Sequence, residues 1–109
     1  MMTPMTPVIV LSTVGAGFDA RPIARALVEQ RLAACVNIVP GVTSIYRWQE
    51  RVDEEGEQLL VIKTVEANLD ALRDALFARH PYDVPEFVVL PVASTSEAYG
   101  AWLVESTSR

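Results

Sequence analysis

The order of the hydrophobic patterns along the chain constrains its fold more than any other feature of the sequence. Short runs rich in β-branched residues predict strands, whereas apolar residues spaced three and four apart predict helices. The expected elements follow in this order: a strand at 7–14, a helix from 19 to about 31, a strand at 32–48, a strand from 59 onward, a helix at 68–79, a strand at 85–92 and a short closing helix from 96 onward. This order is that of the ferredoxin-like α+β sandwich, a split β-α-β fold with both main helices on one face of a four-stranded sheet.

Residues that start or break regular structure separate these elements. Asp19 is expected to cap the first helix, which carries Pro22 in its first turn. Pro40 and Gly41 interrupt the second strand, so we expect a kink or a bulge there. The acidic stretch 53–56 is expected to form the turn of a long antiparallel hairpin.

Two of the expected strands are apolar on both sides. Residues 59–62 and 87–90 are continuously hydrophobic, as strands are when both faces of a sheet are covered. The two main helices cover one face, and the short closing helix, which is expected to place Tyr99, Trp102 and Leu103 on one side, is too small for the other. A second copy of the chain can supply the missing cover, so the pattern predicts a homo-oligomer packed through its sheet faces.

Composition limits the class of protein. A chain of 109 residues forms one domain, which we expect at residues 7–109 after a flexible tail at 1–6. A net charge of −5 argues against nucleic acid as a partner. The apolar runs are too short to span a membrane, and the N-terminus lacks the pattern of a signal peptide. With a single cysteine, Cys35, no internal disulfide can form, and we expect a cytoplasmic protein.

The glycine motif at residues 15–20 fits G-x-G-x-x-A, the fingerprint of dinucleotide-binding sites. The acidic residue that should follow about 20 positions later is absent, because Asn37 stands there, and the fold lacks repeated parallel units. A structural turn is therefore favoured. The sequence also lacks a nucleophile elbow, paired thiols and a helical pair of histidines, so we expect a protein that is not an enzyme.

The loop that follows the second main helix gathers reactive side chains within seven residues. They are His80, Tyr82, Asp83 and Glu86, in a loop that two prolines make rigid. The position of His80 is compatible with three roles: a metal ligand, an acid–base group, or a cation that interacts with the carbonyl end of a helix. Cys35 suits a soft metal ligand or a small core residue. One imidazole and one thiol cannot close a metal site alone, so carboxylates or a neighbouring subunit would have to contribute, and this pair favours copper or zinc.

A charged residue and two aromatic residues mark the expected hairpin. Lys63 interrupts an apolar strand and needs an acid or an anionic ligand, and Glu57 on the same strand is a candidate acid. Tyr46 and Trp48 alternate with Arg47, so their rings share one face. They suit either an interface between subunits or the wall of a ligand cleft.

Three ordered segments give the sequence a family resemblance. Residues 31–48, 60–64 and 80–86, followed by Leu-Pro-Val at 90–92, closely resemble the CutA divalent-cation-tolerance family, and the likeness extends over about 8–104. The resemblance implies a ferredoxin-like fold, a PII-like homotrimer, a cytoplasmic location and a role in tolerance of copper or another divalent metal ion.

The resemblance also implies functional positions. The proposed metal-binding positions of the family match His80, Glu86 and Cys35. The residues implied for an inter-subunit cleft are Lys63, Tyr46, Trp48, Tyr82 and, where Glu is common in the family, Asp83. Three functions are considered, in this order: a trimer that binds copper or a similar divalent ion, a PII-like sensor that binds an anionic metabolite in the cleft, and an acid–base enzyme. The enzyme would use His80 with Asp83 or Glu86, and it ranks last because the sequence has no recognisable nucleophile or cofactor site.

Overall fold

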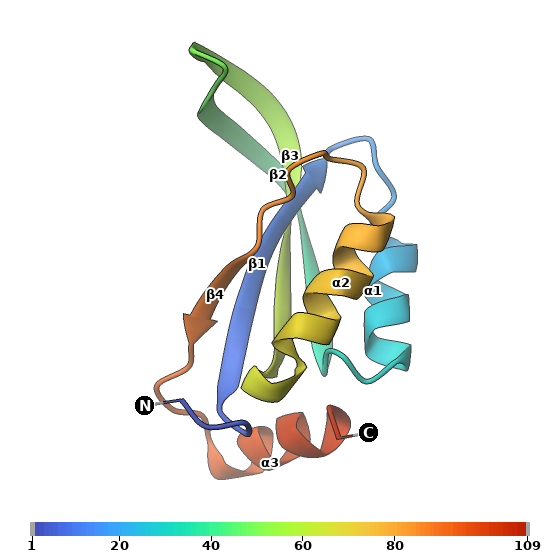
Figure 1. Cartoon of the computed structure of the whole chain (residues 1–109), viewed down its shortest axis with the longest axis vertical. Coiled ribbons are helices and arrows are strands. Elements are labelled where there is room, and N and C mark those ends of the chain that lie inside the picture. The colour runs from blue at the N-terminus through green and yellow to red at the C-terminus, as the bar shows by residue number, and fades with distance from the viewer. Residues whose placement is uncertain (1, 109) are drawn as a thin grey trace.

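A computed structural model describes residues 2–108 of the chain, which form one four-stranded antiparallel sheet and three α-helices. The sheet order is β2-β3-β1-β4, and α1 and α2 lie side by side on one face while α3 crosses one end (Figure 1). The predicted ferredoxin-like α+β fold is confirmed. The elements are β1 (Pro7–Gly15), α1 (Arg21–Glu29), β2 (Cys35–Trp48), β3 (Arg51–Val65), the 3₁₀ helix η1 (Glu66–Asn68), α2 (Leu69–Arg79), β4 (Val88–Pro91) and α3 (Glu97–Ser106).

The core lies between the sheet and the two main helices. Every second residue of β1 and β3 points toward α1 and α2, as the two-residue period of a strand requires. Each fully buried Leu or Ile on this face stabilises the fold by about 1.5–3 kcal/mol relative to an exposed position. The fully buried aliphatic residues at its centre are Val10, Val14, Leu60, Ile62, Leu72 and Leu76.

The opposite face of the sheet is apolar and incompletely covered. Leu59 and Val61 of β3 are half-buried, and Val88 and Leu90 of β4 remain 45% and 43% exposed. We call this surface the open face. The two-sided apolar strands predicted from the sequence are therefore present. None of the described helices is long and apolar enough to cross a membrane.

The start of α1 is close to the prediction, and its end differs. The N-cap residue is Ala20 rather than the predicted Asp19, and no side chain caps the helix, although the carboxylate of Asp19 accepts the backbone N–H of Arg21 at 3.1 Å. Pro22 lies in the first turn, as predicted. The helix ends at Glu29, two residues earlier than predicted. Arg31 adopts a φ of 58°, a left-handed conformation that cannot continue a helix.

The hairpin between β2 and β3 corrects one prediction and confirms another. The bulge at Pro40-Gly41 is confirmed, because the pairing register shifts between Val39 and Val42 and Gly41 has a φ of 77°. The predicted turn at 53–56 is wrong: the chain reverses at Gln49 and Glu50, whose φ values are 48° and 67°. A two-residue turn of this hand usually contains Asn or Gly, so Gln-Glu carries no recognisable signal. The end of the β2–β3 hairpin that carries this turn, which we call the arm, projects beyond the body of the protein (Figure 1).

The remaining elements follow the prediction with shorter bounds. The second main helix begins at Leu69 rather than residue 68. The last strand, β4, covers Val88–Pro91 rather than 85–92, because only these four residues pair with β1. Ser96 caps α3 as predicted, by accepting the N–H of Tyr99. On α3, Leu103 is buried, whereas Tyr99 and Trp102 are exposed in this chain.

The segment before β1 contacts the body of the protein. The carbonyls of Pro4 and Thr6 accept hydrogen bonds from the backbone of Ala67 and Glu66 at 3.0 Å. The first residue of the expected tail (1–6) and the last residue of the expected domain (7–109) lie outside the described residues.

Candidate functional site

His80 is fixed by two hydrogen bonds at the end of α2. Its Nδ1 accepts the backbone N–H of Tyr82 at 3.0 Å, and its Nε2 lies 2.8 Å from the carbonyl oxygen of Thr13. Because a backbone N–H can only donate, Nδ1 is the unprotonated nitrogen, and Nε2 donates its hydrogen to the Thr13 carbonyl. The contacts therefore select one neutral tautomer and orient the ring against β1.

Tyr82 joins this loop to the base of the hairpin. Its hydroxyl donates to Oε2 of Glu57 at 2.6 Å, and Glu57 is only 7% exposed. Burial and then the hydrogen bond to Glu57 raise the pKa of Tyr82 above the ordinary value of 10.0. Within residues 2–108, no Lys, Arg or His nitrogen forms an ion pair with Glu57.

The surroundings of Tyr82 carry negative charge. Asp53, Glu55 and Glu57 alternate along β3, so their side chains share one face. Hydrogen bonding with Glu55 raises the pKa of Tyr46, which belongs to the paired strand on the same face. An anionic ligand would meet these carboxylates, so the electrostatics at this place favour a cation.

Cys35 lies far from His80 within one chain. It opens β2, is half-buried, and pairs with Lys63 of β3, which in turn pairs with Ile9 of β1. The carbonyl that holds His80 belongs to Thr13, four residues further along β1, or about 13 Å. Glu86 is half-buried in the loop next to β4. Among the described residues, no three His, Cys, Asp or Glu side chains are grouped so that they could hold a metal ion.

Lys63 does not pair with Glu57, so that interpretation is wrong. The two residues share one face of β3 but stand six positions apart, or about 20 Å along an extended strand. The ammonium instead lies 6.0 Å from the centre of the Tyr99 ring on α3. A half-buried lysine can keep its charged end in water beside an aromatic ring, and no buried acid is then required.

The residues expected to line a cleft are dispersed in a single chain. Tyr46 lies close enough to Tyr82 to contribute to the raised pKa of Tyr82, after burial and the carboxylates of Glu57 and Glu55. Trp48 lies near the tip of the arm opposite Arg51, and Asp83 is exposed on the loop. Lys63, at the other end of the sheet, is separated from all four.

Gln58 is a structurally important residue without a recognisable signal in the sequence, and Glu57, the candidate acid for Lys63, has Tyr82 as its partner instead. The side-chain amide of Gln58 donates to the carbonyls of Gly15 and Phe18 at 2.9 and 2.7 Å. It closes the glycine-containing turn and thereby confirms that the G-x-G-x-x-A segment forms a structural turn. The alternation of acids at positions 53, 55 and 57 was a usable signal that these side chains share a face, but the contact of Glu57 with Tyr82 depends on tertiary structure.

Together these features define a class: a small ferredoxin-like α+β domain with an open apolar sheet face and a histidine loop anchored to the end of its sheet. The family model described as CutA1 divalent ion tolerance protein matches residues 8–106. The chain therefore belongs to the CutA1 divalent ion tolerance family.

Individual relatives agree with this assignment. The divalent-cation tolerance protein CutA of Thermus thermophilus is 54% identical over 91% of this chain and 96% of its own length. The chloroplastic protein CutA of Arabidopsis thaliana is 42% identical over 92% of this chain, which spans only 55% of that protein. The solved structure of the Thermus thermophilus protein has a TM-score of 0.89 at 53% identity, covering 94% of this chain and 99% of that one. A structure described as the periplasmic CutA of Archaeoglobus fulgidus has a TM-score of 0.88 at 27% identity over 94% of this chain and 99% of that one.

Proposed function

We propose that this protein acts in divalent-cation tolerance as a homotrimer that binds copper or a similar divalent metal ion, without catalysing a reaction. The orientation of His80 carries the proposal. Metal-binding histidines usually donate their second ring N–H to a carbonyl or carboxylate, and the Nε2–H of His80 is held in this way by Thr13. Nδ1 is then the atom that coordinates the metal ion. Metal binding therefore breaks the hydrogen bond that the backbone N–H of Tyr82 donates to Nδ1.

The remaining ligands would come from more than one subunit. Glu86 belongs to the same loop as His80, whereas Cys35 lies across the sheet. Packing of open faces would bury the exposed apolar residues of β4 and bring different chains together. Imidazole, thiolate and carboxylate from two chains form a donor set that suits copper or zinc better than magnesium or calcium.

The cytoplasm is the proposed location. Relatives of this chain are named chloroplastic in Arabidopsis thaliana and periplasmic in Archaeoglobus fulgidus, so the fold serves in several compartments. A half-buried thiol as the single cysteine suits a reducing environment. The net charge of −5 supports a metal cation, rather than nucleic acid, as the partner.

Copper titration of His80→Ala tests this proposal. Loss of one ligand should weaken binding at least tenfold, or about 1.4 kcal/mol. Tyr82→Phe is the matched control, because it removes the hydroxyl bond to Glu57 from the same loop while retaining every proposed ligand. The control should bind copper like the wild type. Equal affinities of wild type and His80→Ala would exclude His80 as a ligand, and equal losses in both variants would assign the effect to the loop.

A further inference from the structure

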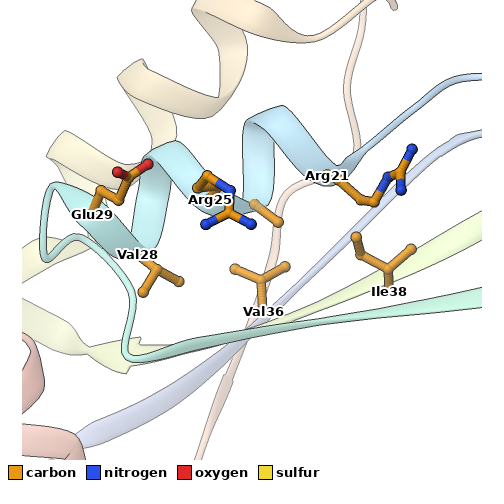
Figure 2. Close-up of a pocket in the computed structure, with 7 residues that line it drawn as sticks. Arg21, Arg25, Val28, Glu29, Val36 and Ile38 are labelled. Carbon is orange, nitrogen blue, oxygen red and sulfur yellow. The ribbon is translucent and has the colours of Figure 1, made fainter.

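An open groove runs between α1 and the first half of β2. It encloses about 360 Å³, and Val36 and Ile38 rise from β2 toward the helix (Figure 2). Both residues belong to the side of the sheet that faces α1 and α2, and they pack against the main core. The groove is therefore on the opposite side of the sheet from the open face, and packing of open faces leaves it accessible.

Arg25 supplies a cation over this apolar wall. Its neighbour Arg21 is already bound to Asp19 by two contacts of 2.9 and 3.0 Å. In the part of the chain that the structure describes, no carboxylate lies within ion-pair distance of Arg25. Glu29, one turn further on, directs its carboxylate away from β2 (Figure 2). An unpaired guanidinium thus borders an apolar groove on a protein of net charge −5.

A second hollow continues the groove toward α3. It encloses about 300 Å³, shares Val28 and Glu29 with the first, and reaches Ala34 and Trp102. The Trp102 side chain is 44% exposed, so its indole is accessible. Arg31 and Ser106 also line the second hollow, so a cation stands beside Trp102 there as well. The apolar wall formed by Val36 and Ile38 belongs to the first hollow, beside Arg25.

We propose that the first hollow binds an amphipathic monocarboxylate, with its carboxylate on Arg25 and its alkyl chain along Val28, Val36 and Ile38. The planar fork of a guanidinium matches a carboxylate in two parallel hydrogen bonds. A single negative charge suits the site because Glu29 and the net charge of the protein repel polyanions. Apolar contact with the walls supplies the remaining affinity.

Titration of the full ¹⁵N-labelled protein with octanoate tests the proposal by NMR. Chemical-shift changes are expected in α1 and in residues 35–38, with smaller changes at the indole N–H of Trp102 in the second hollow. Arg25→Gln should weaken binding at least tenfold, and Val36→Thr, which keeps the shape of the wall but adds a hydroxyl, should weaken it severalfold. Arg79→Gln, an exposed arginine at the end of α2, is the matched control and should bind like the wild type.

Octylamine distinguishes the contribution of the carboxylate to binding from that of the alkyl chain, because it has the same chain length as octanoate and the opposite charge. It should cause no saturable shifts in the groove. The proposal is overturned if octanoate binds Arg25→Gln as well as the wild type, if octylamine binds the groove equally, if the shifts map to the open face, or if octanoate causes none.

Discussion

The two faces of the sheet are built from similar residues but differ in what covers them. On the helix face, Leu60 and Ile62 have no exposed surface, whereas on the open face Val88 and Leu90 remain almost half exposed. Leu59 and Leu60 are adjacent residues of one type on opposite faces of β3. The helix face is completed by the chain itself, and the open face needs another surface. The stability of the single chain should therefore depend mainly on the helix face, and assembly of the oligomer on the open face.

Leu60→Ala should produce the largest effect. A fully buried leucine replaced by alanine loses its apolar contacts and leaves a cavity, which lowers the free energy of unfolding by about 2–5 kcal/mol. Leu59→Ala on the open face should lower it less. Urea denaturation at a fixed protein concentration measures both, since assembly contributes to stability. Equal decreases in the free energy of unfolding for Leu60→Ala and Leu59→Ala would contradict the difference between the two faces.

Leu90→Glu should separate assembly from folding. Burying an unpaired charge costs several kcal/mol, so the subunits should associate about 100-fold more weakly or worse. The exposed position in a single chain should leave the fold intact. Light scattering after size-exclusion chromatography measures the mass, and circular dichroism checks the fold. An unchanged oligomer would place the interface elsewhere.

Tyr82→Phe tests the contact with Glu57, a carboxylate on the open face that the chain itself buries. Glu57 would lose its hydroxyl donor, at a cost of about 1.5–3 kcal/mol in the free energy of unfolding. Since folding raises the pKa of Tyr82, its contribution is complete below the ordinary pKa of 10.0 and declines as pH rises above that value. Denaturation between pH 8 and 11, a range that spans the usual tyrosine pKa of about 10, should show a shallower decline for the variant. Parallel profiles would contradict the assignment.

Ser12→Ala should have the smallest effect, and it should be favourable. Ser12 is fully buried on the helix face, and within the described residues its hydroxyl has no hydrogen-bond partner. Removing an unsatisfied buried hydroxyl should stabilise the fold by up to about 1 kcal/mol. Thermal and urea unfolding measure the change. A clear loss of stability would mean that the hydroxyl is hydrogen-bonded in solution.

The sequence was informative where local patterns determine structure and silent where distant residues meet. Alternation and helical spacing predicted the sheet, both main helices and the bulge at Pro40-Gly41. The turn at Gln49-Glu50 was missed because neither residue type usually adopts positive φ. His80 and Tyr82 stood out as reactive residues, but their contacts with Thr13 and Glu57 join segments far apart in the chain.

Native mass spectrometry of the untagged protein, purified without chelator and then mixed with copper(II), tests the central claim most directly. We expect a species of three 12.0 kDa chains that carries copper, and His80→Ala should give the same trimer with less metal. A stable monomer would contradict the role of the open face. A trimer that stays free of metal in excess copper would contradict the proposed function.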